Sequence, residues 1–143
     1  MEFWLEKAAE YLPGLDDLLT REQAMPGPMA LWIDLHFELV KAYDASPPNQ
    51  ALIRGIYDFA AWCLAQPQTD DVSTDLPTAV AVAFIEHLPL DRPVAHDLHR
   101  WMSLESFEGF ESLFRYHLSD EEYRQFSRDF RSRKKPSDPP PRL

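Results

Sequence analysis

The sequence is short of glycine, and this shortage excludes several kinds of chemistry. The four glycines are isolated from one another: Gly14, Gly27, Gly55 and Gly109. Isolated glycines do not build the loops that cradle phosphates or dinucleotides, and no Gly-x-Ser-x-Gly elbow of a serine hydrolase is present. We therefore expect neither a nucleotide-dependent enzyme nor a serine hydrolase, and we expect no cofactor.

Cysteine and long hydrophobic runs are also scarce. The single cysteine, Cys63, allows no intramolecular disulfide, which favours a cytoplasmic protein, and its neighbours Trp62 and Leu64 indicate a small core residue. The longest uncharged apolar run, residues 79–85, is far shorter than the roughly 18 residues of a membrane helix. The first residues are acidic where an export signal is basic. The sequence therefore predicts no membrane insertion and no export.

Positive charge is scarce outside the last twenty residues. The chain has 24 Asp and Glu against 14 Lys and Arg, a formal net charge of −10 at pH 7. Half of the bases lie beyond residue 123, so the first 123 residues hold 22 carboxylates and seven bases. An acidic body repels nucleic acid and attracts basic proteins through its summed field. We therefore expect a basic protein partner and no nucleic acid.

Proline, in contrast, is abundant, and it divides the chain. Thirteen prolines cluster between the apolar runs, where they end one helix and begin the next. The 143 residues, 45% of them hydrophobic and 13% aromatic, suffice for one core. We expect one domain over residues 1–132, followed by a flexible, proline-rich and basic tail over residues 133–143.

Apolar residues recur at helical spacing in most segments between the prolines. The expected helices cover residues 2–12, 16–24, 29–45, 50–66, 93–102, 103–118 and 120–132. Asn49 and Ser103 are suited to cap helices, and Ser119 with Glu122 forms the pattern of a capping box. The run 79–85 fits a buried strand or a central helix, and its helical neighbours favour the helix. The sequence predicts an all-α fold of seven or eight helices, in antiparallel pairs that form an irregular bundle or a short α-solenoid-like array.

Three histidines lie within apolar helix stripes: His36, His87 and His117. If their helices meet, the imidazoles and a neighbouring carboxylate, Glu86 or Asp58, form a buried cluster suited to metal binding or proton transfer. The alternative is that each imidazole packs as a small aromatic and donates one ring proton to a backbone carbonyl. Histidines without a surrounding sequence motif are weak evidence for a catalytic or metal site, so the packing role is favoured.

Two further groups of polar residues are candidates for metal binding. His96 and His99 are three residues apart on the polar side of a short helix, a spacing that metal ligands use. Two ligands do not make a site, and we expect an exposed pair without metal. A long loop gathers three acids: Asp70, Asp71 and Asp75. The loop lacks the glycine and glutamate of a calcium loop, so helix capping and solvation account for these acids.

Core-type residues dominate four stretches of the chain: Trp62–Leu64, Ala79–Pro89, Arg100–Ser103 and Phe114–Ser119. In these stretches the chain resembles a family of small uncharacterised bacterial proteins. The resemblance covers about residues 29 to 124. It implies a bacterial, cytoplasmic protein, and it carries no activity, cofactor or catalytic residue over to this chain.

Functions of three classes remain open. The first is a non-enzymatic binding module whose acidic face recognises a basic protein, for example an immunity-type or inhibitory protein that masks a toxin. The second is a small metal- or histidine-dependent enzyme that uses the buried histidines and acids named above. The third is self-association through the aromatic stripe of the last helix. The lack of a catalytic motif favours the binding module.

Overall fold

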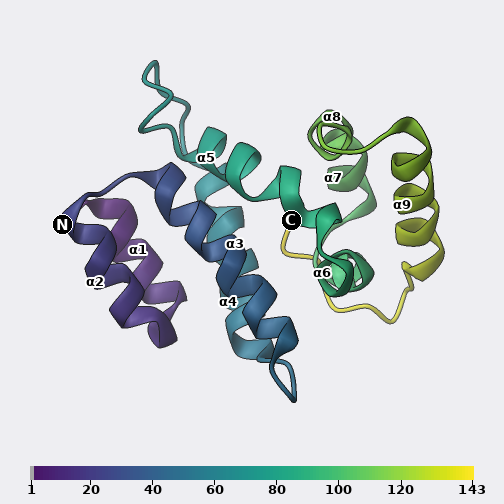
Figure 1. Ribbon diagram of the computed structural model, residues 1–143, viewed down its shortest axis with the longest axis horizontal. Coiled ribbons are helices and arrows are strands. Elements are labelled where there is room, and N and C mark those ends of the chain that lie inside the picture. The colour runs from purple at the N-terminus through teal and green to yellow at the C-terminus, as the bar shows by residue number, and fades with distance from the viewer. Residues whose placement is uncertain (1) are drawn as a thin grey trace.

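The computed structural model describes residues 2–143 and consists mostly of helices joined by short turns, with a longer loop over residues 65–75 and a non-helical C-terminal segment (Figure 1). The α-helices of this part of the chain are α1 (Phe3–Tyr11), α2 (Asp16–Ala24), α3 (Pro28–Asp44), α4 (Gln50–Leu64), α5 (Leu76–Ala83), α6 (Arg92–Asp97), α7 (Leu104–Gly109), α8 (Glu111–Arg115) and α9 (Asp120–Arg133). Three short 3₁₀ helices lie between them: η1 (Pro13–Leu15), η2 (Ile85–Leu90) and η3 (Leu98–Arg100). No strand occurs among the described residues, and the predicted all-α fold is confirmed.

Side-chain caps begin several helices as the sequence predicts. Asn49 accepts a hydrogen bond from the main-chain N–H of Leu52 at 3.2 Å, at the start of α4. Ser103 caps α7 in the same way, and Ser119 with Glu122 forms the complete capping box of α9. Each cap satisfies main-chain donors that the first turn of a helix leaves without partners.

The helix expected over residues 103–118 is in fact two helices. The chain leaves regular helical geometry at Phe110, with φ −94° and ψ 11°, directly after Gly109. Glycine has a low helix propensity, which makes this a favourable place for a break. The break brings the α-helices of the described residues to nine where seven or eight were expected. The helix expected over residues 93–102 is a shorter α6 followed by η3.

The helices are arranged as pairs along the long axis of the molecule (Figure 1). α1 packs against α2 and α4, and α3 packs against α4 and α5. α6 to α9 lie at the opposite end from α1 and α2, and η2 contacts α5, α6 and α8. We refer to residues 2–83, which hold α1 to α5, as the N-terminal half and to residues 84–143 as the C-terminal half. Of the helices described, none combines the length and the apolar character needed to cross a membrane.

Large aromatic side chains fill the core that joins the two halves. Trp32 stacks on Phe59 with ring centroids 5.3 Å apart, and Tyr57 stacks on Trp101 at 5.4 Å. Cys63 is buried in the same core, and burial raises the pKa of its thiol to about 12. A thiol in this state is a packing group, as its neighbours in the sequence indicate.

Gly55 brings α4 into main-chain contact with α1. A Cβ atom on Gly55 would lie 2.5 Å from the carbonyl oxygen of Tyr11 and 3.3 Å from Cδ2 of Leu12. Only glycine leaves room for such an approach. The contact fixes the last turn of α1 against α4.

The last residues of the chain return to the body of the molecule, unlike the solvated tail expected over residues 133–143. Lys134 donates from Nζ to the carbonyl oxygen of His99 at 2.8 Å. The main-chain N–H of Leu143 donates to the carbonyl oxygen of Trp101 at 2.9 Å, and Leu143 packs against the core. These contacts satisfy carbonyl groups at the end of η3. The proline-rich, basic composition of residues 133–143 gives no sign of this role.

Candidate functional site

Five aromatic rings follow one another across the middle of the molecule, and we call them the ring row. They are, in order, Phe37, His36, His87, His117 and Tyr116. Successive ring centroids are 5.9, 5.5, 4.9 and 4.9 Å apart. The three histidines that the sequence singles out are therefore neighbours in the fold.

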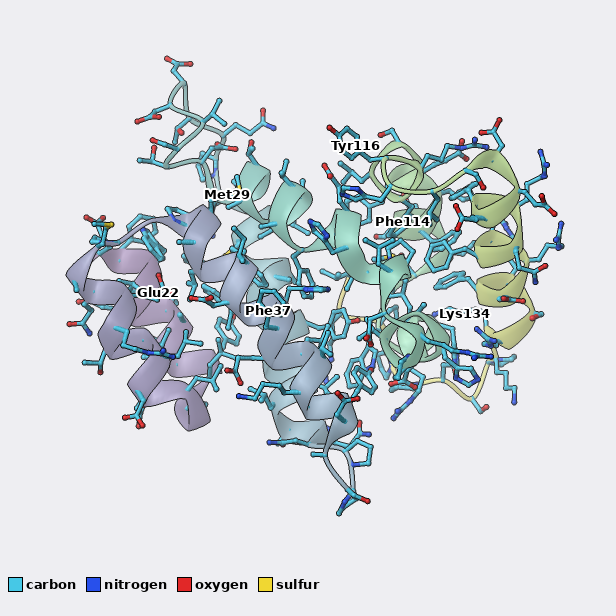
Figure 2. All side chains as sticks on the ribbon, viewed as in Figure 1. Glu22, Met29, Phe37, Phe114, Tyr116 and Lys134 are labelled. Carbon is cyan, nitrogen blue, oxygen red and sulfur yellow. The ribbon has the colours of Figure 1, made fainter. Side chains whose placement is uncertain are left out.

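Three separate elements supply the ring row. His36 lies on α3, His87 on η2, and His117 in the turn after α8. Phe37 and Tyr116 are 61% and 74% exposed, and Figure 2 shows them over α3 and beside α8. The row is thus open to solvent at both ends, whereas His36 and His87 are half-buried.

The electrostatic environment keeps part of the ring row neutral. Glu86 is buried, and its Oε1 lies 3.3 Å from Nε2 of His117. Burial lowers the pKa of His36, and the neighbouring His87 lowers it further, while Asp91 acts in the opposite direction. Nε2 of His36 is buried without a hydrogen-bond partner. His36 is therefore neutral at pH 7, because its lowered pKa lies further below 7 than that of a free imidazole.

Other candidate residues lie away from the ring row. Asp58, expected to support the histidines, has its Oδ1 3.4 Å from Nη1 of Arg142 instead. Nδ1 of His99 lies 2.9 Å from Oδ2 of Asp138, and both side chains are largely buried, whereas His96 is exposed. His99 is thus not exposed as expected, because the last residues of the chain cover it. Within residues 2–143, no three side chains of His, Cys, Asp or Glu are placed to hold one metal ion.

A second candidate site is a cavity of about 540 Å³ in the N-terminal half, which we call the N-terminal groove. Its walls come from three segments: the start of α1, the turn that leads into α3, and the loop between α4 and α5. Most of the lining is apolar. Its size lies within the roughly 300–1,000 Å³ of ligand sites in proteins.

The loop between α4 and α5 forms one wall of the N-terminal groove, and it projects from the helices in Figure 1. Asp75 anchors the loop, because it accepts hydrogen bonds from the main-chain N–H groups of Thr69 at 2.6 Å and Thr78 at 2.9 Å. The hydroxyl of Thr78 and these N–H groups lower the pKa of Asp75. Asp71 accepts from Ser73 within the loop. Capping and local bonding thus account for these two acids, as expected.

Negative charge is concentrated in the half of the molecule that holds the groove. The N-terminal half contains 13 carboxylates and four bases, whereas the C-terminal half contains 11 and ten. Their formal charges are therefore −9 and −1. Because α1 and α2 lie at one end of the long axis and α9 at the other, the imbalance along the sequence becomes a separation of charge in space (Figure 1).

Sequence reasoning misses one acidic pair, which joins α2 to α3. Glu22 is buried and shares a hydrogen bond with Asp34 (Figure 2 shows Glu22 on α2). Burial, and then the bond and charge of Asp34, raise the pKa of Glu22 from 4.5 to about 7. The available signal is its position three and four residues after the buried Leu19 and Leu18, which puts all three on one face of α2.

The chain matches no protein-family model, and no curated protein or solved structure is significantly similar to it. Its function is therefore inferred from the ring row, the N-terminal groove and the distribution of charge.

Proposed function

We propose that the protein is a non-enzymatic, acidic helical module that binds a basic partner protein. The observation that supports this function is the charge of −9 on the N-terminal half, where an apolar groove opens to solvent. Proteins that combine an apolar contact area with a charge of one sign select partners of the opposite sign and of complementary shape.

The same distribution of charge affects the rate of association with the partner. A strongly charged surface accelerates the approach of an oppositely charged partner, and salt weakens this attraction because the Debye length falls to about 8 Å at 0.15 M. Association with the basic partner therefore slows as the salt concentration rises. The groove contacts act after docking, so they govern dissociation.

A specific form of the proposal is an immunity-type or inhibitory protein that masks a basic protein such as a nuclease. Fast, steered association suits a protein that must neutralise a toxin at low concentration. This role goes with a bacterial, cytoplasmic protein, the setting that the resemblance and the single cysteine favour.

The direct test is affinity capture from a lysate at about 0.05 M and about 0.3 M salt, followed by association kinetics with the captured protein. Two variants with the same change in net charge are compared. Glu2→Gln with Asp70→Asn removes charge beside the groove, and Glu105→Gln with Glu121→Gln removes it from the C-terminal half. We expect the first pair to slow association severalfold more than the second.

Three results contradict the proposal. The first is the lack of any partner whose capture weakens with salt. The second is an equal effect of both variant pairs on the association rate, which would mean that the partner senses only total charge. A captured protein with an acidic surface counts against the proposal in the same way.

A second candidate function, histidine-dependent catalysis, is favoured by the convergence of three imidazoles with Glu86 in the ring row. Its metal-dependent form is tested by elemental analysis of protein purified without chelator. Stoichiometric zinc, iron or manganese in the wild type that is lost in His87→Ala supports metal-dependent catalysis, whereas purified protein without metal contradicts it. Sedimentation over a concentration series tests the third role, self-association.

A further inference from the structure

The entrance of the N-terminal groove is unusually apolar for an exposed surface. Phe3 lines the groove and is 58% exposed, while its ring is held edge-on against Trp62 at 6.0 Å. Met25 and Val72, which directly precede the lining residues Pro26 and Ser73, are 84% and 65% exposed. Exposed apolar side chains that gather at one cavity are a signature of a docking surface.

The polar groups in the walls of the groove are already occupied within the chain. Ser73 donates from its hydroxyl to Oδ1 of Asp71 at 2.6 Å, and Thr74 donates to the carbonyl oxygen of Asp71 at 3.2 Å. Gln66 donates from Nε2 to the carbonyl oxygen of Trp62 at 3.0 Å. An occupant therefore has few donors to satisfy inside the groove, and apolar contact provides its affinity.

The charged groups around the groove are acids. Glu2 is part of the lining, and Asp70 and Asp71 belong to the loop that forms one wall. No Lys or Arg is found among the described lining residues. A cation close to the apolar anchor of a partner is attracted here, whereas an anion is repelled.

We propose that the N-terminal groove holds an apolar side chain of the basic partner, presented by a segment in which Lys or Arg flanks that side chain. This inference rests on the proposed function and identifies the part of the partner that is recognised. The groove receives the anchor, and the surrounding carboxylates receive the flanking cations.

The test uses three capped peptides and the isotope-labelled protein. The first peptide is Gly-Arg-Arg-Leu-Arg-Arg-Gly, the second replaces its Leu by Ser, and the third replaces its Arg residues by Glu. We expect amide shifts from the first peptide at Thr69, Ser73 and Thr74, and weaker binding of the other two. Phe3→Ala weakens the first peptide about fivefold, because part of the buried apolar area is lost. Phe37→Ala is the matched control, since its 61% exposed ring lies in the ring row, and it leaves affinity unchanged.

The outcomes separate this inference from the proposed function. Salt-sensitive binding of both Arg peptides, with shifts outside the groove and no preference for Leu, overturns the groove assignment and leaves the acidic-module proposal standing. Equal binding of the Arg and Glu peptides, or equal effects of Phe3→Ala and Phe37→Ala, also overturns it. If Phe3→Ala does not fold, Thr74→Phe narrows the groove from the loop side, and it is expected to weaken the Leu peptide alone.

Discussion

The buried acid on α2 gives a quantitative prediction about stability. Glu22 lies between α2 and α3 and shares a hydrogen bond with Asp34, and burial together with Asp34 raises the pKa of Glu22 from 4.5 to about 7. In the folded protein Glu22 therefore keeps its proton over a range in which the unfolded chain has already lost it. The substitution Glu22→Gln replaces the acid by a group that has the shape and donor of its protonated form.

The sign follows from proton binding. Below pH 4.5 both states of the wild type hold this proton, and the stability that Glu22 contributes is fully present. Between 4.5 and about 7 the folded state binds more protons than the unfolded state, so the contribution is lost as the pH rises. A rise in the pKa of Glu22 from 4.5 to about 7 corresponds to a loss of about 3 kcal/mol in the free energy of unfolding as the pH rises.

The assay is urea denaturation of the wild type, Glu22→Gln and Glu6→Gln at a series of pH values from 4 to 8. Glu6 is exposed on the neighbouring α1, so its substitution is a control for the loss of one charge. We expect the stability of Glu22→Gln relative to the wild type to increase by about 3 kcal/mol across the series. The curve of Glu6→Gln should stay parallel to the wild type. His36, whose lowered pKa gives the opposite slope below 6.5, is present in all three proteins and cancels.

Parallel curves for the wild type and Glu22→Gln would refute the reasoning. They would mean that Glu22 ionises in the folded protein as it does in the unfolded chain, and hence that its carboxyl group is hydrated or paired with a cation. A difference that grows towards low pH would refute it as well, because it has the opposite sign.

Three other predictions concern packing and capping. Gly55→Ala is expected to lower the free energy of unfolding by about 1–3 kcal/mol through its clash with α1. Gly109→Ala is the control and should not lower it, because no heavy atom lies within 4 Å of the added Cβ. Equal effects of the two substitutions in urea denaturation would contradict the close contact. Asp75→Ala removes the cap of α5 and should cost about 1 kcal/mol more than Asp70→Ala in thermal unfolding. The buried Cys63 should react with a thiol reagent only when the protein unfolds, and rapid labelling of native protein would show that the core is open there.

The sequence predicts most of the helices because their boundaries depend on local chemistry. Asn49 and Ser119 act as caps within three residues of themselves, so their signals are complete in the sequence. The break at Phe110 is harder to foresee, since Phe110 also continues an apolar stripe and only Gly109 hints at the interruption. The return of Leu143 to Trp101 depends on a contact between residues far apart, which composition does not encode.

The candidate sites are harder to predict from the sequence, because they too depend on contacts between residues far apart in the chain. Apolar stripes predict that His36, His87 and His117 face inward, but His117 is exposed, and the adjacency of the three depends on how α3, η2 and the turn after α8 meet. The N-terminal groove gives no signal at all, because the three segments that form its walls are separate in the sequence and ordinary in composition. Asp58 shows the opposite error: its place on the narrow polar side of a mostly apolar helix suggests a role beside the histidines, but in the fold it pairs with Arg142.

The contact between Gly55 and Tyr11 has a mechanical consequence for the binding surface at the other end of α1. The nine residues of this helix span about 13 Å, and Phe3, at its first position, lies at the mouth of the groove. The helix is held against α4 at Gly55 near its C-terminal end, and it carries the ring of Phe3 at its N-terminal end. We therefore expect a methyl group added at Gly55 to shift α1 and, with it, the position of Phe3 at the mouth of the groove.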